Sequence, residues 1–83
     1  MASRAVILEV LRSHPLSTSA ELVEAMGFER GTAEYVREYE NVRKKLPKMR
    51  SWGEVEAVDL HIPSIPVRWY CPGDLPPPRD VGI

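Results

Sequence analysis

Hydrophobic residues recur at helical spacing over residues 4–13, and this pattern predicts a first helix there. The apolar positions fall on one side of that helix and comprise Val6, Ile7, Val10 and Leu11. Ser3 precedes them and is a suitable N-cap. Pro15 ends the helix, because a proline ring disfavours helical geometry in the residue before it.

A second, short helix is predicted from Thr18 or Ser19 to about Met26. Thr18 and Glu21 match the capping-box pattern, in which each side chain accepts a hydrogen bond from the backbone N–H of the other residue. The positions expected to be buried are Leu22, Val23 and Met26. Gly27 suits the left-handed conformation that commonly ends a helix.

The third and longest helix is predicted from about Arg30 to about Leu46, where Pro47 limits it. Its apolar side comprises Phe28, Thr32, Tyr35, Val36, Tyr39, Val42 and Leu46. The opposite side carries polar residues at steps of three and four. This stripe comprises Arg30, Glu34, Arg37, Asn41, Lys44 and Lys48, with Lys45 beside it. We therefore expect an exposed, mainly basic face along this helix.

Apolar and polar residues alternate over residues 54–62 and 67–71, on either side of a proline-bounded turn at 63–66. Two alternating runs around a turn predict a β-hairpin. Leu16 is a candidate for a short third strand, and Cys71, at a strand end, is expected to be buried. The expected fold class is therefore α+β, with a domain over residues 1–72 and an extended, proline-rich tail over 73–83.

The composition is that of one small globular domain of 83 residues and 9.4 kDa, without room for a large substrate cavity. The net charge is −1, but residues 29–50 carry seven basic residues against four acidic ones. The single cysteine excludes a disulfide framework and favours a reducing compartment. No apolar run approaches the ~20 residues of a membrane span, and a signal-peptide cleavage site is lacking, so we expect a cytoplasmic protein.

Residues 21–28, with the sequence ELVEAMGF, show the pattern E-L-x-E-A-x-G followed by a hydrophobic residue, and Thr32 lies near the start of the next helix. Over residues 4–72 the chain thereby resembles the winged helix-turn-helix domain of small transcriptional regulators. The resemblance implies a three-helix bundle with a C-terminal hairpin as the wing. It also implies sequence-specific binding of double-stranded DNA, with the third helix in the major groove.

The resemblance and the basic stripe together nominate the DNA-binding residues. On the third helix and just before it they are Arg30, Thr32, Glu34, Arg37, Asn41, Lys44, Lys45 and Lys48. Arginine binds guanine or phosphate, and asparagine pairs with adenine. Ser17 and Thr18, at an exposed start of the second helix, are expected to hold a phosphate. Arg68, on the wing, is expected to contact the backbone or the minor groove, as is Ser64.

The chain departs from the family pattern at the start of the third helix. The family pattern would bury Ala33 and Arg37, whereas the apolar period buries Thr32, Val36 and Tyr39. We follow the period, because burying an unpaired arginine is costly. The first turn stays open, because burial of Ala33 would turn Tyr35 from the core toward the DNA.

Two other hypotheses stay open. The acidic residues 51–83 and the near-neutral net charge favour a winged-helix module that binds proteins instead of DNA. A homodimer is a further hypothesis, formed through the apolar face of the first helix, Trp52 and the tail. His14, His61 and Cys71 lack metal-ligand spacing, and no catalytic constellation is visible. We therefore expect neither an enzyme nor a metal, cofactor or small-molecule site.

Overall fold

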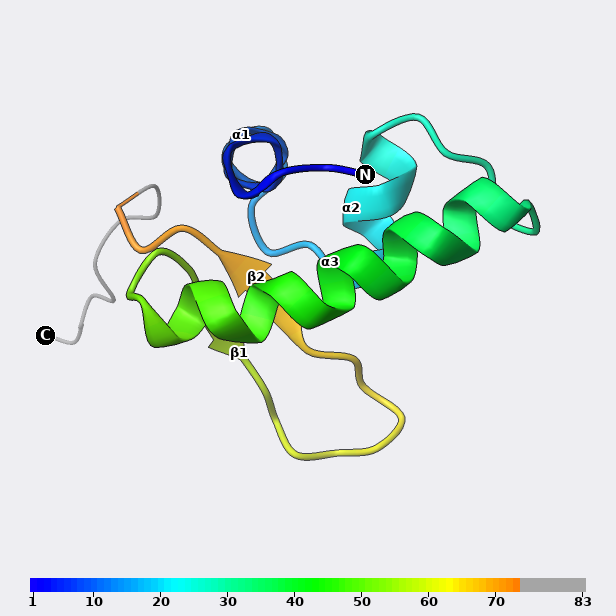
Figure 1. Ribbon diagram of the computed structural model, residues 1–83. Helices are drawn as coiled ribbons and strands as arrows, with labels where there is room; N and C mark the ends of the chain where they lie inside the picture. The colour runs from blue at the N-terminus through cyan, green and yellow to red at the C-terminus, as the bar shows by residue number, and fades with distance from the viewer. Residues whose placement is uncertain (74–83) are drawn as a thin grey trace, which may run out of the picture.

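The computed structural model describes residues 1–73, in which three helices are followed by a two-stranded antiparallel sheet (Figure 1). The elements are α1 (Arg4–Ser13), α2 (Ser19–Ala25), α3 (Ala33–Ser51), β1 (Glu56–Val58) and β2 (Arg68–Tyr70). This order confirms the predicted α+β class with three helices and a hairpin.

The predictions for α1 and α2 are confirmed, together with their caps. The Ser3 hydroxyl accepts a hydrogen bond from the Val6 N–H at 3.3 Å. At the start of α2, the Thr18 hydroxyl accepts from the Glu21 N–H and the Glu21 carboxylate accepts from the Thr18 N–H. Gly27 follows α2 with a φ of +100°, the left-handed conformation that few other residues adopt at low cost.

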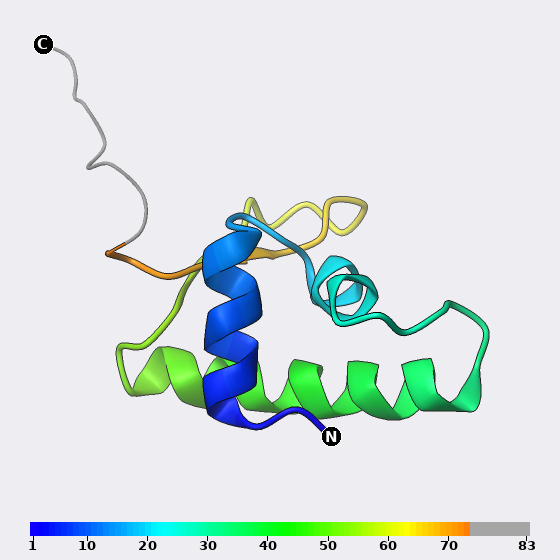
Figure 2. The same cartoon turned by 90° about the horizontal axis from the view of Figure 1, so that it is seen from above.

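The core lies where α1, α2 and the hairpin meet one side of α3. Figure 2 shows α1 crossing α3, with α2 beside it and the hairpin behind. The buried apolar residues are Ile7, Leu11, Leu22, Val23, Val42, Leu46, Met49, Val55 and Cys71. The burial of Cys71 confirms its prediction. The apolar face of α1 is used in this core through Ile7 and Leu11, while Val6 is exposed.

The predicted start of α3 at Arg30 is wrong by three residues. Gly31 adopts a φ of +87°, which is incompatible with a helix. Thr32 is the N-cap instead, and its hydroxyl accepts a hydrogen bond from the Tyr35 N–H at 3.1 Å. The local bonding of one threonine therefore decides where the helix begins.

The predicted end of α3 before Pro47 is also wrong, because the helix continues through Pro47 to Ser51. A proline inside a helix costs roughly 3 kcal/mol through its missing N–H and its ring. The extra turn buries Met49, which contributes about 1.5–3 kcal/mol. It is closed by hydrogen bonds, among them one from the Glu54 N–H to the Met49 carbonyl at 3.0 Å. Packing therefore offsets the local cost of the proline.

The apolar period of α3 predicted its buried face only in part. Val42 and Leu46 are buried, and Tyr35 and Tyr39 pack against the core with their rings stacked, which places Tyr35 on the core side. Val36, however, is 56% exposed, and the charged Glu38 is buried at 2% exposure. Ala33 and Arg37 are exposed, so the family burial pattern does not hold at these two positions.

The hairpin is shorter than predicted. Each strand has three residues, with Ala57 opposite Trp69, and a nine-residue loop over 59–67 joins them. The predicted third strand is reduced to a bridge between Ser17 and Trp69. Leu16 itself has a φ of +61° and is not extended. Side chains around the loop that alternation placed in a strand are exposed; they are Val58, Leu60 and Ile62.

The predicted boundary at residue 72 falls at the end of the part that the structure describes, so the proline-rich tail lies outside the described residues. Trp69, expected in the core or in a dimer contact, packs against the core, whereas Trp52 is exposed. Within residues 1–73, none of the helices combines the length and the apolar character that a membrane span requires.

Candidate nucleic-acid interface

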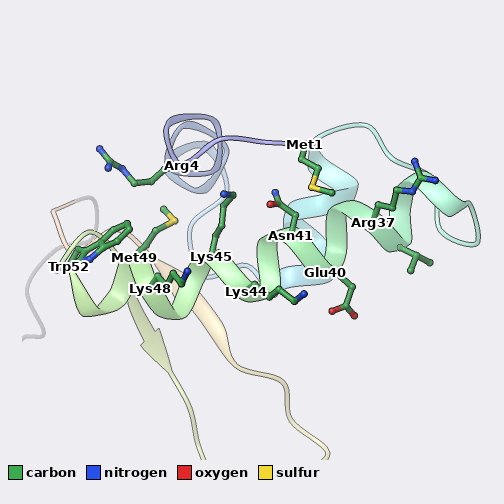
Figure 3. A pocket seen from close by; sticks show the side chains of 11 residues that line it. Met1, Arg4, Arg37, Glu40, Asn41, Lys44, Lys45, Lys48, Met49 and Trp52 are labelled. Carbon is green, nitrogen blue, oxygen red and sulfur yellow. The ribbon is translucent and has the colours of Figure 1, made fainter.

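A groove of about 650 Å³ runs along α3 on the side where the N-terminal segment crosses it, and we call it the α3 groove (Figure 3). It brings together five of the predicted DNA-binding residues, which are Arg37, Asn41, Lys44, Lys45 and Lys48. Met1 and Arg4 line it from the N-terminal segment and α1. The remaining lining residues of α3 and its C-cap are Val36, Glu40, Met49 and Trp52.

Four cations of the α3 groove have no partner within residues 1–73. These groove cations are Arg37, Lys44, Lys45 and Lys48, and none takes part in a salt bridge or a side-chain hydrogen bond in the described structure. Their spacing of seven, one and three residues keeps them on one flank of α3. The groove therefore carries a local positive charge that nothing in the described chain neutralises.

Five other arginines, from α1, α3, the α2–α3 connection and the hairpin, behave differently, because each forms a salt bridge with a carboxylate. The pairs are Arg4 with Glu54, Arg30 with Glu24, Arg43 with Glu40, Arg50 with Glu56 and Arg68 with Glu21. The hydrogen bond to the Glu40 carboxylate raises the pKa of the Arg43 guanidinium above its ordinary value. Glu24 raises the pKa of Arg30 in the same way.

A second groove, of about 590 Å³, lies on the opposite flank of α3, between α2 and β2, and we call it the hairpin groove. It holds three other predicted DNA-binding residues, which are Thr18, Arg30 and Arg68. No residue lines both grooves. The structure therefore divides the predicted site between two surfaces, and the arginines of the hairpin groove (Arg30, Arg43 and Arg68) are all paired.

The expected exposure of Ser17 and Thr18 at the start of α2, on which the predicted phosphate site depended, is wrong, because both residues are buried. The Ser17 hydroxyl donates to the His14 carbonyl, and its backbone pairs with Trp69. The Thr18 hydroxyl and N–H are both used in the capping box. Ser17 thereby joins the start of α2 to the hairpin, and Thr18 caps α2.

Thr32 and Glu34 line neither groove. The Thr32 hydroxyl caps α3 and donates to the Glu29 carbonyl at 2.7 Å. Glu34 is exposed in the first turn of α3, where a carboxylate favours the helix dipole. Both residues thus serve the start of the helix.

Asn41 lines the α3 groove, but its amide is committed to the protein. Nδ2 donates to the Ala2 carbonyl and to Glu38 Oε2, each at 3.0 Å. Both carboxylate oxygens of the buried Glu38 accept from the Ala2 N–H, at 3.1 and 3.0 Å. Together the two side chains clamp the N-terminal segment onto α3. Sequence reasoning missed this clamp, since its partners lie 36 and 39 residues apart.

Apolar groups of the α3 groove were missed as well. Val36 was placed in the core by the apolar period, and Trp52 was expected in the core or in a dimer contact. Both border the groove instead, with 56% and 61% of their surface exposed. In the sequence, Val36 and Trp52 look like ordinary core residues. Only the packed structure shows that they border the groove.

Comparisons with protein-family models, with curated proteins and with solved structures found no match for this chain. The case for a function therefore rests on the chemistry of the two grooves.

Proposed function

We propose that this chain binds double-stranded DNA through the α3 groove, with α3 in the major groove, as an intracellular regulator of transcription with a winged-helix type of fold. The order of three helices and a hairpin supports the fold. The observation that carries the function is the contrast between the four groove cations, which have no partner within residues 1–73, and the five arginines that are paired with carboxylates.

The charge pattern supports a polyanionic partner. Ion pairs cancel charge locally, and the chain uses its carboxylates in this way at Arg30, Arg43 and Arg68. At the groove cations no carboxylate from the described part of the chain does so; Glu40, which also lines the α3 groove, accepts from Arg43 instead. A polyanion that fills this groove would neutralise several charges at once and release its own counterions.

The dimensions of α3 support duplex DNA as that partner. At 1.5 Å per residue its 19 residues extend about 28 Å, and the groove cations from Arg37 to Lys48 extend roughly 16 Å. The major groove of B-DNA is wide enough for one helix and is bordered by rows of phosphates. Lysines spaced along the flank of such a helix reach those phosphates.

The hairpin contributes little to this proposed interface. Arg68, its arginine, donates to the Leu16 carbonyl at 2.9 Å and to Glu21 at 3.1 Å. A wing that contacts DNA needs free positive charge, and this pairing removes it. We therefore assign most of the binding free energy to α3.

Salt dependence tests the proposal. If three or four groove cations neutralise phosphates, the slope of log affinity against log salt is expected to be roughly −2.7 to −3.6. Between 50 and 200 mM salt, the Kd for a fluorescent duplex should then rise roughly 40- to 150-fold, measured by anisotropy. A slope near zero would contradict contacts with the phosphates.

Absence of duplex binding at 50 mM salt would favour the protein-interaction module instead. One observation supports that alternative. Four apolar side chains around the hairpin loop are exposed, namely Val58, Leu60, Ile62 and Ile65. If these side chains form one contiguous surface, it would be of the kind that typically binds other proteins.

The homodimer stays a prediction. The core uses Ile7 and Leu11 of the contact proposed from the sequence; among its described residues Ala5, Val6 and Trp52 are exposed, and its tail lies outside the described residues. Sedimentation at high micromolar concentration measures the mass directly. A species of twice 9.4 kDa is the expected result for a dimer, and a species of 9.4 kDa alone would exclude it.

A further inference from the structure

We propose that the α3 groove binds the sugar-phosphate backbone and does not read bases, so that duplexes of any sequence bind with similar affinity. This inference rests on the proposed DNA binding and narrows its substrate class. It replaces the sequence-specific binding that the family resemblance implied. The first step of the argument is the state of Asn41, the expected adenine reader.

Asn41 cannot read a base without breaking the clamp. Pairing with adenine requires the amide nitrogen as a donor and the amide oxygen as an acceptor. Both hydrogens of Nδ2 are already donated, to the Ala2 carbonyl and to Glu38. Turning the amide outward would remove a partner from the buried Glu38 carboxylate and leave the Ala2 carbonyl unpaired. The free energy lost with these two hydrogen bonds is of the same order as the free energy gained from one contact with a base. Asn41 therefore gains nothing by leaving the clamp to bind adenine.

The other groove residues are suited to phosphate. Lys44, Lys45 and Lys48 are compact charges on flexible stems and carry no planar pattern of donors that matches a base edge. Among the residues that line the groove, Arg37 is the one arginine that has no partner within residues 1–73, and a single guanidinium group is a weak basis for recognising a DNA sequence. Glu40, the groove's carboxylate, accepts from Arg43 at 2.9 Å.

The apolar residues of the groove add contact area that does not distinguish one base pair from another. Val36 and Trp52 line the groove and are exposed, and the proposal assigns them to apolar contact with deoxyribose. The indole N–H of Trp52 is a donor only, so it cannot distinguish the four base pairs by a donor–acceptor pattern. The whole groove thus combines charge with apolar contact, as expected for backbone binding.

A panel of duplexes tests the inference with the full chain. Three duplexes of about 20 base pairs are compared by anisotropy at 50 mM salt, with alternating A·T, alternating G·C and mixed sequences. We expect their Kd values to agree within fivefold. A preference greater than fivefold for one of them would overturn the inference while leaving the proposed DNA binding intact. Failure of all three to bind would overturn both.

Two variants distinguish recognition of bases by Asn41 or Arg37 from other roles of these side chains. Asn41→Ala is expected to lower the melting temperature, because it removes two hydrogen bonds of the clamp, and to leave the ratio of the three Kd values unchanged. Arg37→Lys keeps the positive charge but removes the planar guanidinium group. The ratio of the three Kd values should be unchanged in this variant as well. A ratio that shifts by more than fivefold in either variant would show base reading at that residue. The panel with the unsubstituted chain remains decisive if Asn41→Ala does not fold.

Discussion

The double variant Lys44→Gln/Lys48→Gln is expected to bind duplex DNA roughly 100-fold more weakly than the unsubstituted chain at 50 mM salt. Each phosphate that a lysine neutralises contributes roughly tenfold to the association constant at that concentration. Both lysines are exposed and unpaired within residues 1–73, so their loss should change the free energy of unfolding by no more than about 0.5 kcal/mol each. The slope against log salt should fall by about two.

The matched control is Arg30→Gln/Arg68→Gln, which removes the same formal charge from the hairpin groove. Those arginines are already paired with Glu24 and Glu21, neither of which lines the α3 groove, so a much smaller loss of affinity is expected. Anisotropy titrations and thermal melts of both variants provide the comparison. An equal loss of affinity in the two variants would show that net charge, and not the α3 groove, determines binding.

The second large effect concerns the stability of the turn beyond Pro47. Met49→Ala is expected to lower the free energy of unfolding by about 2–5 kcal/mol, because it removes a side chain that is fully enclosed by the core. Pro47→Ala is expected to raise the free energy of unfolding by about 1–3 kcal/mol, since Pro47 is exposed inside a helix and alanine restores the missing N–H.

Chemical denaturation of both single variants and of the double variant measures these changes. The stabilised Pro47→Ala background keeps Met49→Ala folded if the substitution alone unfolds so small a domain. Lys48→Ala, one residue before Met49 but exposed, is the control and should be nearly neutral. A cost below about 1 kcal/mol for Met49→Ala would mean that the last turn of α3 does not pack in solution.

Short-range chemistry was enough to predict the first half of the fold. The caps of α1 and α2 join residues three apart, as in Ser3 with Val6 and Thr18 with Glu21, so the pattern contains both partners. The hairpin was predicted for a similar reason, because the alternation of apolar and polar residues on each side of a proline turn is a short-range pattern in the sequence. The basic flank of α3 also followed from spacing alone, and four of its cations do share one groove.

The sequence alone therefore determined which segments form helices and a hairpin, and where the positive charge lies on α3. Tertiary contacts decided the rest. Burial of Met49 carries α3 past Pro47, and the clamp of Glu38 and Asn41 on Ala2 withdraws the predicted base reader from the groove. The sequence pattern also did not predict that the DNA-binding residues would be divided between two grooves. Each of these outcomes depends on side chains that are distant in the sequence and come into contact only in the folded chain. The free-energy cost of a proline in a helix, or of a buried carboxylate, is offset by these long-range contacts. A short-range sequence pattern does not contain them and therefore cannot predict the outcome.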